Sequence, residues 1–167
     1  MIYIFNILSA DNDDFFMQIK IDSENNLYDL HNFIQNELKF DKSQMASFFL
    51  CNKTWEKQKE LPLLDIETNK NIMQETKISD VIKDKNNKLL YVFDLFSDRA
   101  LFISLLDIDK KNETKKIICS EKKGTIPEQI IISDNLNFDN ADDFLDDEFN
   151  DDFNEDLGFE NIDDYDF

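Results

Sequence analysis

The sequence predicts an α+β domain followed by an acidic tail, and three patterns in its 167 residues support this prediction. Apolar runs typical of strands occur in pairs, at residues 2–21 and 88–108. Between them, residues 27–38 carry apolar side chains at helical spacing. Residues 134–167 hold 15 of the 37 acidic residues and none of the 18 basic ones. We therefore expect a folded domain over residues 1–133, which suffices for one core, and a separate tail over residues 134–167.

The N-terminal part of the chain predicts a hairpin followed by a helix. Residues 2–8 (IYIFNIL) are almost continuously apolar, and apolar and polar residues alternate in residues 15–21, so both are expected to be strands joined by a turn at residues 10–13. Residues 27–38 follow, with Asn26 in a position to cap a helix. Four apolar residues share one face of this helix: Leu27, Leu30, Ile34 and Leu38. We expect that face to cover the hairpin.

The rest of the domain predicts further strands and one short helix. The expected elements are, in order, a strand at residues 46–51, an irregular excursion of roughly 25 residues, a short helix at residues 76–82, strands at residues 88–95 and 100–108, and a strand at residues 116–119. This order predicts a mixed, largely antiparallel sheet with one main helix on one face, similar to a β-grasp. Trp55 lies in the excursion, where it contributes either to a docking patch or to the cover of a satellite core.

Composition excludes several classes of function. Two glycines and two prolines leave no glycine-rich phosphate loop, and Cys51 and Cys119 lie 68 positions apart without the CxxC spacing of a zinc site. No apolar run approaches the roughly 20 residues that span a bilayer, and the N-terminus lacks the basic flank of a signal peptide. A net charge of −19 disfavours direct binding to nucleic acid. We expect a cytoplasmic protein with no membrane partner, no metal and no cofactor.

Several segments resemble one known family. Residues 27–50 (LYDLHNFIQNELKFDKSQMASFFL) are similar to the LHxxIQxxFGWxxxHLxxF segment of the plasmid pRi ORF-three-like family, which is also described as a transposon passenger family. ISDVI and then LLYVFDLFSDRALFISL resemble a short helix followed by its YxYDFGDxWxHxI strand pair. Four late residues resemble its CxxGxxxxPPED segment: Cys119, Gly124, Pro127 and Glu128. The resemblance covers about residues 1–130, leaves the tail uncovered, and implies an α+β fold without an established activity.

The resemblance implies one candidate ligand pocket. The polar residues at matching positions are His31, Gln35, Asp94 and Asp98. His31, with Asp94, Asp98 or Glu128 nearby, has the chemistry of a general base or a metal ligand; the alternative is a buried side chain that hydrogen-bonds a strand or loop. Asp94 and Asp98 have structural alternatives as residues of the hairpin turn. Phe96 stands where the family has Gly, Arg99 where it has Trp, and Phe102 near its His, so we expect any shared polar site to be reduced.

The tail combines acids with regularly spaced aromatic residues. Five residues are the predicted partner-binding anchors: Phe144, Phe149, Phe153, Leu157 and Phe159. Leu145 begins a four-residue spacing that fits an amphipathic helix capped by Asn140 and ended by Gly158, although repulsion between neighbouring acids weakens such a helix in isolation. We expect the tail to be disordered or to fold on contact. Open alternatives are a solubilising extension, mimicry of nucleic acid, and packing onto the chain's own lysines.

These observations favour a non-enzymatic interaction protein that binds a basic protein partner through its acidic, aromatic tail. The alternative is a small-ligand binder or enzyme of the plasmid ORF-three-like family, with a site around His31 and Asp94. No residue is predicted to be catalytic, and the sequence does not predict an oligomeric state.

Overall fold

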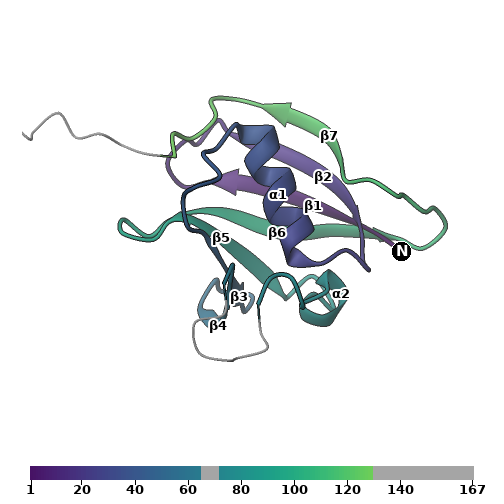
Figure 1. Ribbon diagram of the computed structural model, residues 1–167. Helices are drawn as coiled ribbons and strands as arrows, with labels where there is room; N and C mark the ends of the chain where they lie inside the picture. The colour runs from purple at the N-terminus through teal and green to yellow at the C-terminus, as the bar shows by residue number, and fades with distance from the viewer. Residues whose placement is uncertain (65–71, 130–167) are drawn as a thin grey trace, which may run out of the picture. The chain divides into compact units, whose positions relative to one another are not determined.

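The structure is a computed structural model that describes residues 1–64 and 72–129, and these form an antiparallel sheet with two helices (Figure 1). The strands are β1 (Ile2–Ser9), β2 (Phe16–Asp22), β3 (Ser47–Cys51), β4 (Lys57–Pro62), β5 (Lys88–Asp94), β6 (Arg99–Asp109) and β7 (Ile118–Lys123). The helices are α1 (Leu27–Leu38) and α2 (Ile78–Val81), and neither is long and apolar enough to cross a bilayer. The strand order in the sheet is β4-β3-β5-β6-β1-β2-β7.

The sheet was predicted to be mixed and largely antiparallel. Its antiparallel character is confirmed, and all six strand pairings among the described residues are antiparallel, so it has no parallel part there. Three of them are hairpins, β1–β2, β3–β4 and β5–β6, which are antiparallel by construction. The segment containing α1 connects β2 to β3, which run in the same direction but are separated in the sheet by β5, β6 and β1. No parallel pair results, so the β-grasp topology is not confirmed.

The helix α1 lies across one face of the sheet (Figure 1). It begins at Asn26, whose side-chain oxygen accepts from the backbone N–H of Asp29 at 2.8 Å, while the Asp29 carboxylate accepts from the backbone N–H of Asn26 at 3.2 Å. This reciprocal capping box satisfies two N–H groups that a helix start otherwise leaves unpaired. Lys39, in the left-handed conformation with φ 57°, ends the helix. The apolar face, Leu27, Leu30, Ile34 and Leu38, is buried in the main core.

Two edge strands differ from the sequence-based expectations. β4 (Lys57–Pro62) lies inside the segment that was predicted to be irregular. No strand signal is present in the sequence there, because four of the six residues have polar, exposed side chains and only Leu61 is fully buried. An edge strand needs no apolar alternation when it contributes one side chain to the core. The last strand, β7, spans Ile118–Lys123 instead of residues 116–119, and its side chains are mostly exposed as well.

A second, smaller core lies on the sheet face opposite α1. Side chains of a strand alternate between faces, so Leu89 and Tyr91 join the main core while Leu90 and Val92 join the smaller one. Trp55 covers this smaller core, with its ring in edge contact with the Phe102 ring at a centroid distance of 4.9 Å. Trp55 therefore covers a satellite core, which is one of the two roles that the sequence predicts for it.

The capping box predicts a measurable loss of stability when Asn26 is replaced. We expect Asn26→Ala to lower the free energy of unfolding by about 1 kcal/mol, because the substitution leaves the Asp29 N–H without its acceptor. Urea unfolding followed by the fluorescence of Trp55, the single tryptophan, measures this change. Asn36→Ala is the matched control, since Asn36 is exposed on the same helix. Equal stability of the two variants would contradict the role of the cap.

Candidate functional site

His31 and Gln35 lie one turn apart on α1, and both are buried. The Tyr91 hydroxyl, on β5, is 2.9 Å from His31 Nδ1. Burial lowers the pKa of His31 and raises the pKa of Tyr91, so both side chains are neutral at pH 7. The hydrogen bond thus joins two neutral groups, and either the phenol or an Nδ1–H donates, according to the imidazole tautomer. His31 thus has the buried, hydrogen-bonded environment that its structural alternative predicts.

A hollow of about 280 Å³, which we call the helix pocket, opens beside these two residues. It is lined by Tyr28, His31, Asn32, Gln35, Lys42, Leu63, Leu64 and Gln74. Gln35 Nε2 is buried and has no hydrogen-bond partner. A buried donor without an acceptor destabilises a fold by about 1–3 kcal/mol, so the absence of an acceptor for Gln35 Nε2 needs an explanation.

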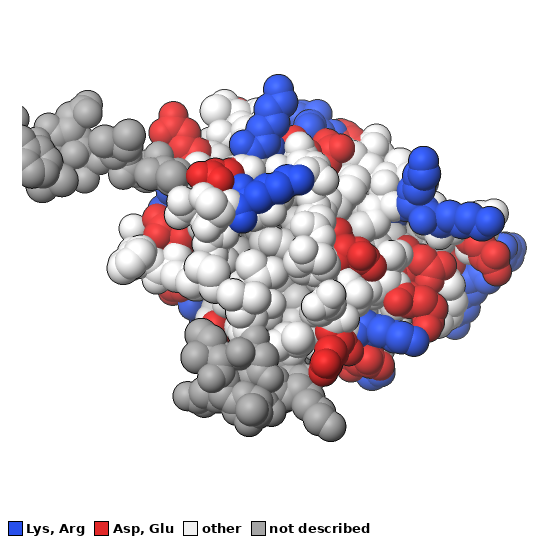
Figure 2. Space-filling view, viewed as in Figure 1, with Lys and Arg blue, Asp and Glu red and all other residues white. Residues whose placement is uncertain are grey.

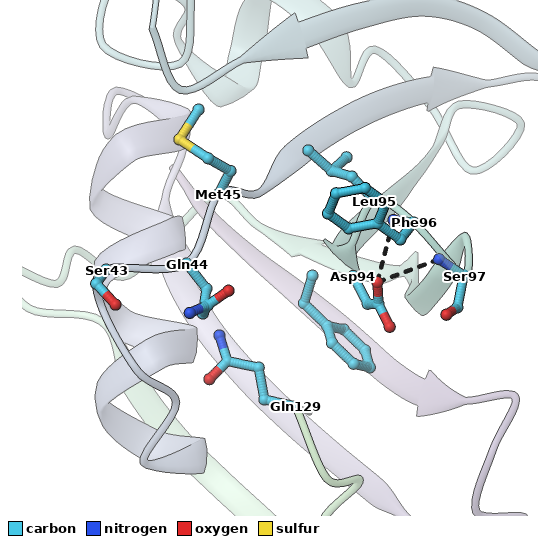
Figure 3. A pocket seen from close by; sticks show the side chains of 9 residues that line it. Ser43, Gln44, Met45, Asp94, Leu95, Phe96, Ser97 and Gln129 are labelled. Atoms are coloured by element: carbon cyan, nitrogen blue, oxygen red, sulfur yellow. Dashed lines mark hydrogen bonds between the residues drawn. The ribbon is translucent and has the colours of Figure 1, made fainter. Parts of the chain in front are cut away.

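Asp94 lies in a different hollow, the hairpin groove, which has a volume of about 410 Å³ (Figure 3). Its lining residues are Ser43, Gln44, Met45, Phe93, Asp94, Leu95, Phe96, Ser97 and Gln129. The Asp94 carboxylate accepts from the backbone N–H groups of Phe96 and Ser97, both at 3.1 Å. The bond from Ser97 is the largest influence that lowers the pKa of Asp94, with smaller contributions from Phe96 and Arg99. Asp94 therefore caps the turn between β5 and β6.

Asp98 lines neither hollow. It occupies a left-handed backbone conformation with φ 52° in the same turn, and its carboxylate pairs with the Lys57 ammonium at 2.5 Å. The structure thus brings His31 and Gln35 together and separates them from Asp94 and Asp98. The pocket predicted from all four residues is not formed as a single site. The tail anchors Phe144, Phe149, Phe153, Leu157 and Phe159 lie outside the described residues.

Arg99 is a residue whose role the sequence did not reveal. Its side chain is only 9% exposed and pairs with Asp11 at 3.0 Å and with Asp94 at 3.9 Å. Its guanidinium also donates to the backbone carbonyls of Glu128, at 2.6 Å, and Gln129, at 3.4 Å. Arg99 therefore joins the β1–β2 turn and the β5–β6 turn to the last described residues. The only sequence signal was that Arg99 departs from the family pattern.

Residues 124–129, which we call the root segment, are held at further points. Gly124 has φ 81°, and a Cβ at this position would collide with the carbonyl oxygen of Asp14, so only glycine fits without a shift of the backbone. Thr125 donates its N–H and its hydroxyl to the Asp14 carboxylate, at 3.0 and 3.1 Å. The Gln129 side chain exchanges two hydrogen bonds with the backbone of Asp41. The root segment is thus bonded along its length to the sheet and its turns.

Metal binding finds no support in the described part of the chain. Across residues 1–64 and 72–129, no group of three His, Cys, Asp or Glu side chains could hold a metal ion. The helix pocket offers hydrogen-bond donors and one ammonium group. The hairpin groove offers the Asp94 carboxylate together with both polar and apolar side chains.

The comparisons with known proteins place the chain in a family. The family model described as plasmid pRiA4b ORF-3-like protein matches residues 4–155, so the chain belongs to this family. The match continues past residue 130, where the resemblance seen in the sequence ends, and includes part of the tail. No match is found among the curated proteins.

The fold is similar to that of a solved structure. It is titled "Crystal Structure of Protein of Unknown Function MM3350 from Methanosarcina mazei Go1", with a TM-score of 0.57 and 16% sequence identity. The similarity covers 75% of this chain and 71% of that chain. At this identity, the similarity shows a shared fold alone.

The neutral, buried state of His31 predicts a specific pH dependence. The unfolded chain protonates His31 near its ordinary pKa of about 6.5, whereas the folded protein resists protonation. Its contribution to stability is therefore present above about pH 6.5 and is lost as the pH falls from there toward the lower folded pKa. We expect wild type to lose more stability than His31→Gln between about pH 7.5 and about pH 5. Urea unfolding at both pH values measures this, and identical losses in the two proteins would contradict it.

Proposed function

We propose that the protein is a non-enzymatic, cytoplasmic interaction protein that uses residues 134–167 to bind a basic surface of a partner protein. The observation that carries this proposal is the composition of the tail, which has 15 acids, no base and regularly spaced Phe residues. Opposite charge accelerates encounter, and aromatic side chains supply the buried contacts that hold a complex together. Plain solubilising segments lack such aromatic residues.

The domain carries far less net charge than the tail, and this difference supports the tail as the binding segment. Residues 1–133 contain 22 acids and 18 bases, so the tail contributes −15 of the net charge of −19 and the domain only −4. On the face shown in Figure 2, acidic and basic side chains are interspersed around a largely uncharged middle. A mixed surface of this kind attracts basic partners weakly. The attraction therefore resides in the tail.

The root segment, which precedes the tail in the sequence, is bonded to the rest of the domain. Hydrogen bonds join this segment to two loops, through Thr125 and Gln129, and to Arg99 on β6. Such bonding is characteristic of a segment that belongs to the domain and contrasts with the fraying common at chain ends. It supports a tail that works together with the domain.

The competing hypothesis, an enzyme that uses His31 with Asp94, receives less support. His31 is bonded to Tyr91, while Asp94 caps a turn and lines a separate hollow. Asp98 is paired with Lys57. Each of these side chains has a structural partner that accounts for its position.

The proposal predicts that the apolar anchors of the tail are needed for binding. In a full-length variant, Phe144, Phe149, Phe153, Leu157 and Phe159 are all replaced by Ser, which retains every charge. We expect capture of the partner from source-cell lysate to fall at least about tenfold for this variant, because truncating several anchors removes most of the binding energy. Wild-type capture should also fall when the salt is raised from about 50 to about 300 mM, since salt screens charge attraction. Quantitative mass spectrometry identifies and measures the recovered proteins.

The matched control is Phe96→Ser, because Phe96 is a fully exposed aromatic residue of the domain. Its captured proteins should equal those of wild type. Equal capture by wild type and by the five-residue variant would exclude aromatic recognition by the tail and leave a solubilising role.

A further inference from the structure

We propose that the helix pocket binds a small organic carboxylate. This site is separate from the tail, and the proposal does not depend on the tail's partner. Its basis is a buried, unpartnered amide donor that lies beside a hollow whose described lining residues include one lysine and no acid.

Gln35 is the first part of the argument. The residue is 2% exposed and contributes to the pocket wall, yet its Nε2 has no acceptor anywhere in reach. Buried polar groups are satisfied in the great majority of cases, so an exception that lines a hollow indicates that an acceptor enters from outside the chain. The terminal amide of Gln turns easily about its last side-chain bond, which allows Nε2 to meet such an acceptor.

The electrostatics of the lining specify the charge of the ligand. Lys42 makes no ion pair with another described residue, and its ammonium is a donor with full positive charge. In a chain of net charge −19, a hollow with an ammonium group and the unpartnered Gln35 amide donor, and with no acid among its described lining residues, is selective for an anionic oxygen.

The remaining walls specify the body of the ligand. Leu63 and Leu64 contribute aliphatic surface, and the Tyr28 ring stacks on the His31 ring with centroids 5.9 Å apart. A volume of about 280 Å³ lies just below the usual range for ligand pockets, so the ligand must be small. The shape therefore suits a carboxylate attached to one ring or to a short aliphatic chain.

The hairpin groove is a weaker ligand site by the same criteria. Its carboxylate, Asp94, is already satisfied by two backbone N–H groups, and it would repel an anion. None of its described lining residues has a buried polar atom without a partner.

The test uses the full chain and three probes: benzoate, hexanoate and the neutral amide benzamide. Each probe is titrated while the side-chain amide signal of Gln35 is followed by ¹H–¹⁵N NMR, with the signal assigned from its absence in Gln35→Leu. We expect at least one carboxylate to shift the Gln35 signal saturably and to bind at least about tenfold more tightly than benzamide, because a charged hydrogen bond is lost in the amide.

Substitutions complete the test. Lys42→Met should weaken carboxylate binding at least about tenfold, whereas Lys83→Met, at an exposed lysine in the loop after α2, should leave it unchanged. Gln35→Leu preserves the side-chain volume and suits a helix, so this variant should fold. Its carboxylate binding, followed through the ring signals of Tyr28 and His31, should be at least about tenfold weaker than that of wild type. The proposal is overturned if neither carboxylate gives a saturable shift, if benzamide binds as tightly as the carboxylates, or if Lys42→Met and Gln35→Leu bind like wild type.

Discussion

The Arg99 guanidinium is the interaction on which the tail-bearing end of the domain depends. It is almost removed from water, and it lies 5.2 Å from the centre of the Phe93 ring. A buried cation loses the free energy of its hydration, which other interactions must replace. For Arg99 these interactions are ion pairs with the carboxylates of Asp11 and Asp94 and hydrogen bonds to two backbone carbonyls. Because these partners come from three separate segments, one side chain fixes the two turns and the root segment relative to one another.

Three parts of the chain differ in the interactions that dominate them. The sheet and α1 are stabilised by a continuous apolar core that includes Phe5, Met17 and Ile34. The root segment contributes little apolar burial and is held by polar contacts, among them those of Thr125 and Gln129. The tail that follows carries most of the net charge. Polar contacts, and not the core, therefore hold the last described residues in place.

Much of the fold was predictable from local patterns. The spacing of Leu27 to Leu38 and the capping chemistry of Asn26 both match α1, because helix signals depend on residues close in sequence. The alternation in residues 15–21 matches β2, whose side chains are buried on one face only. Strand directions were not predictable, since they depend on where the chain re-enters the sheet after α1. β4 was missed because its polar residues give no apolar pattern.

The candidate site was only partly predictable for a related reason. His31 and Gln35 are four residues apart on one helix, so their proximity follows from helical geometry. The contact between His31 and Tyr91 joins positions 60 residues apart and depends on the strand order. Asp94 follows Tyr91 by three residues, about 10 Å along an extended strand, which takes it out of the helix pocket. The role of Arg99 depends equally on distant segments.

The most direct test of the central role of Arg99 is the backbone order of residues 125–129, measured by ¹⁵N relaxation in wild type, Arg99→Met and Lys57→Met. In wild type and in Lys57→Met, which breaks only the exposed pair with Asp98, order parameters of about 0.8 or above are expected in this segment. In Arg99→Met they should fall below about 0.6 while those of α1 remain unchanged. If residues 125–129 stay as ordered in Arg99→Met as in wild type, Arg99 is not the residue that fixes the root segment.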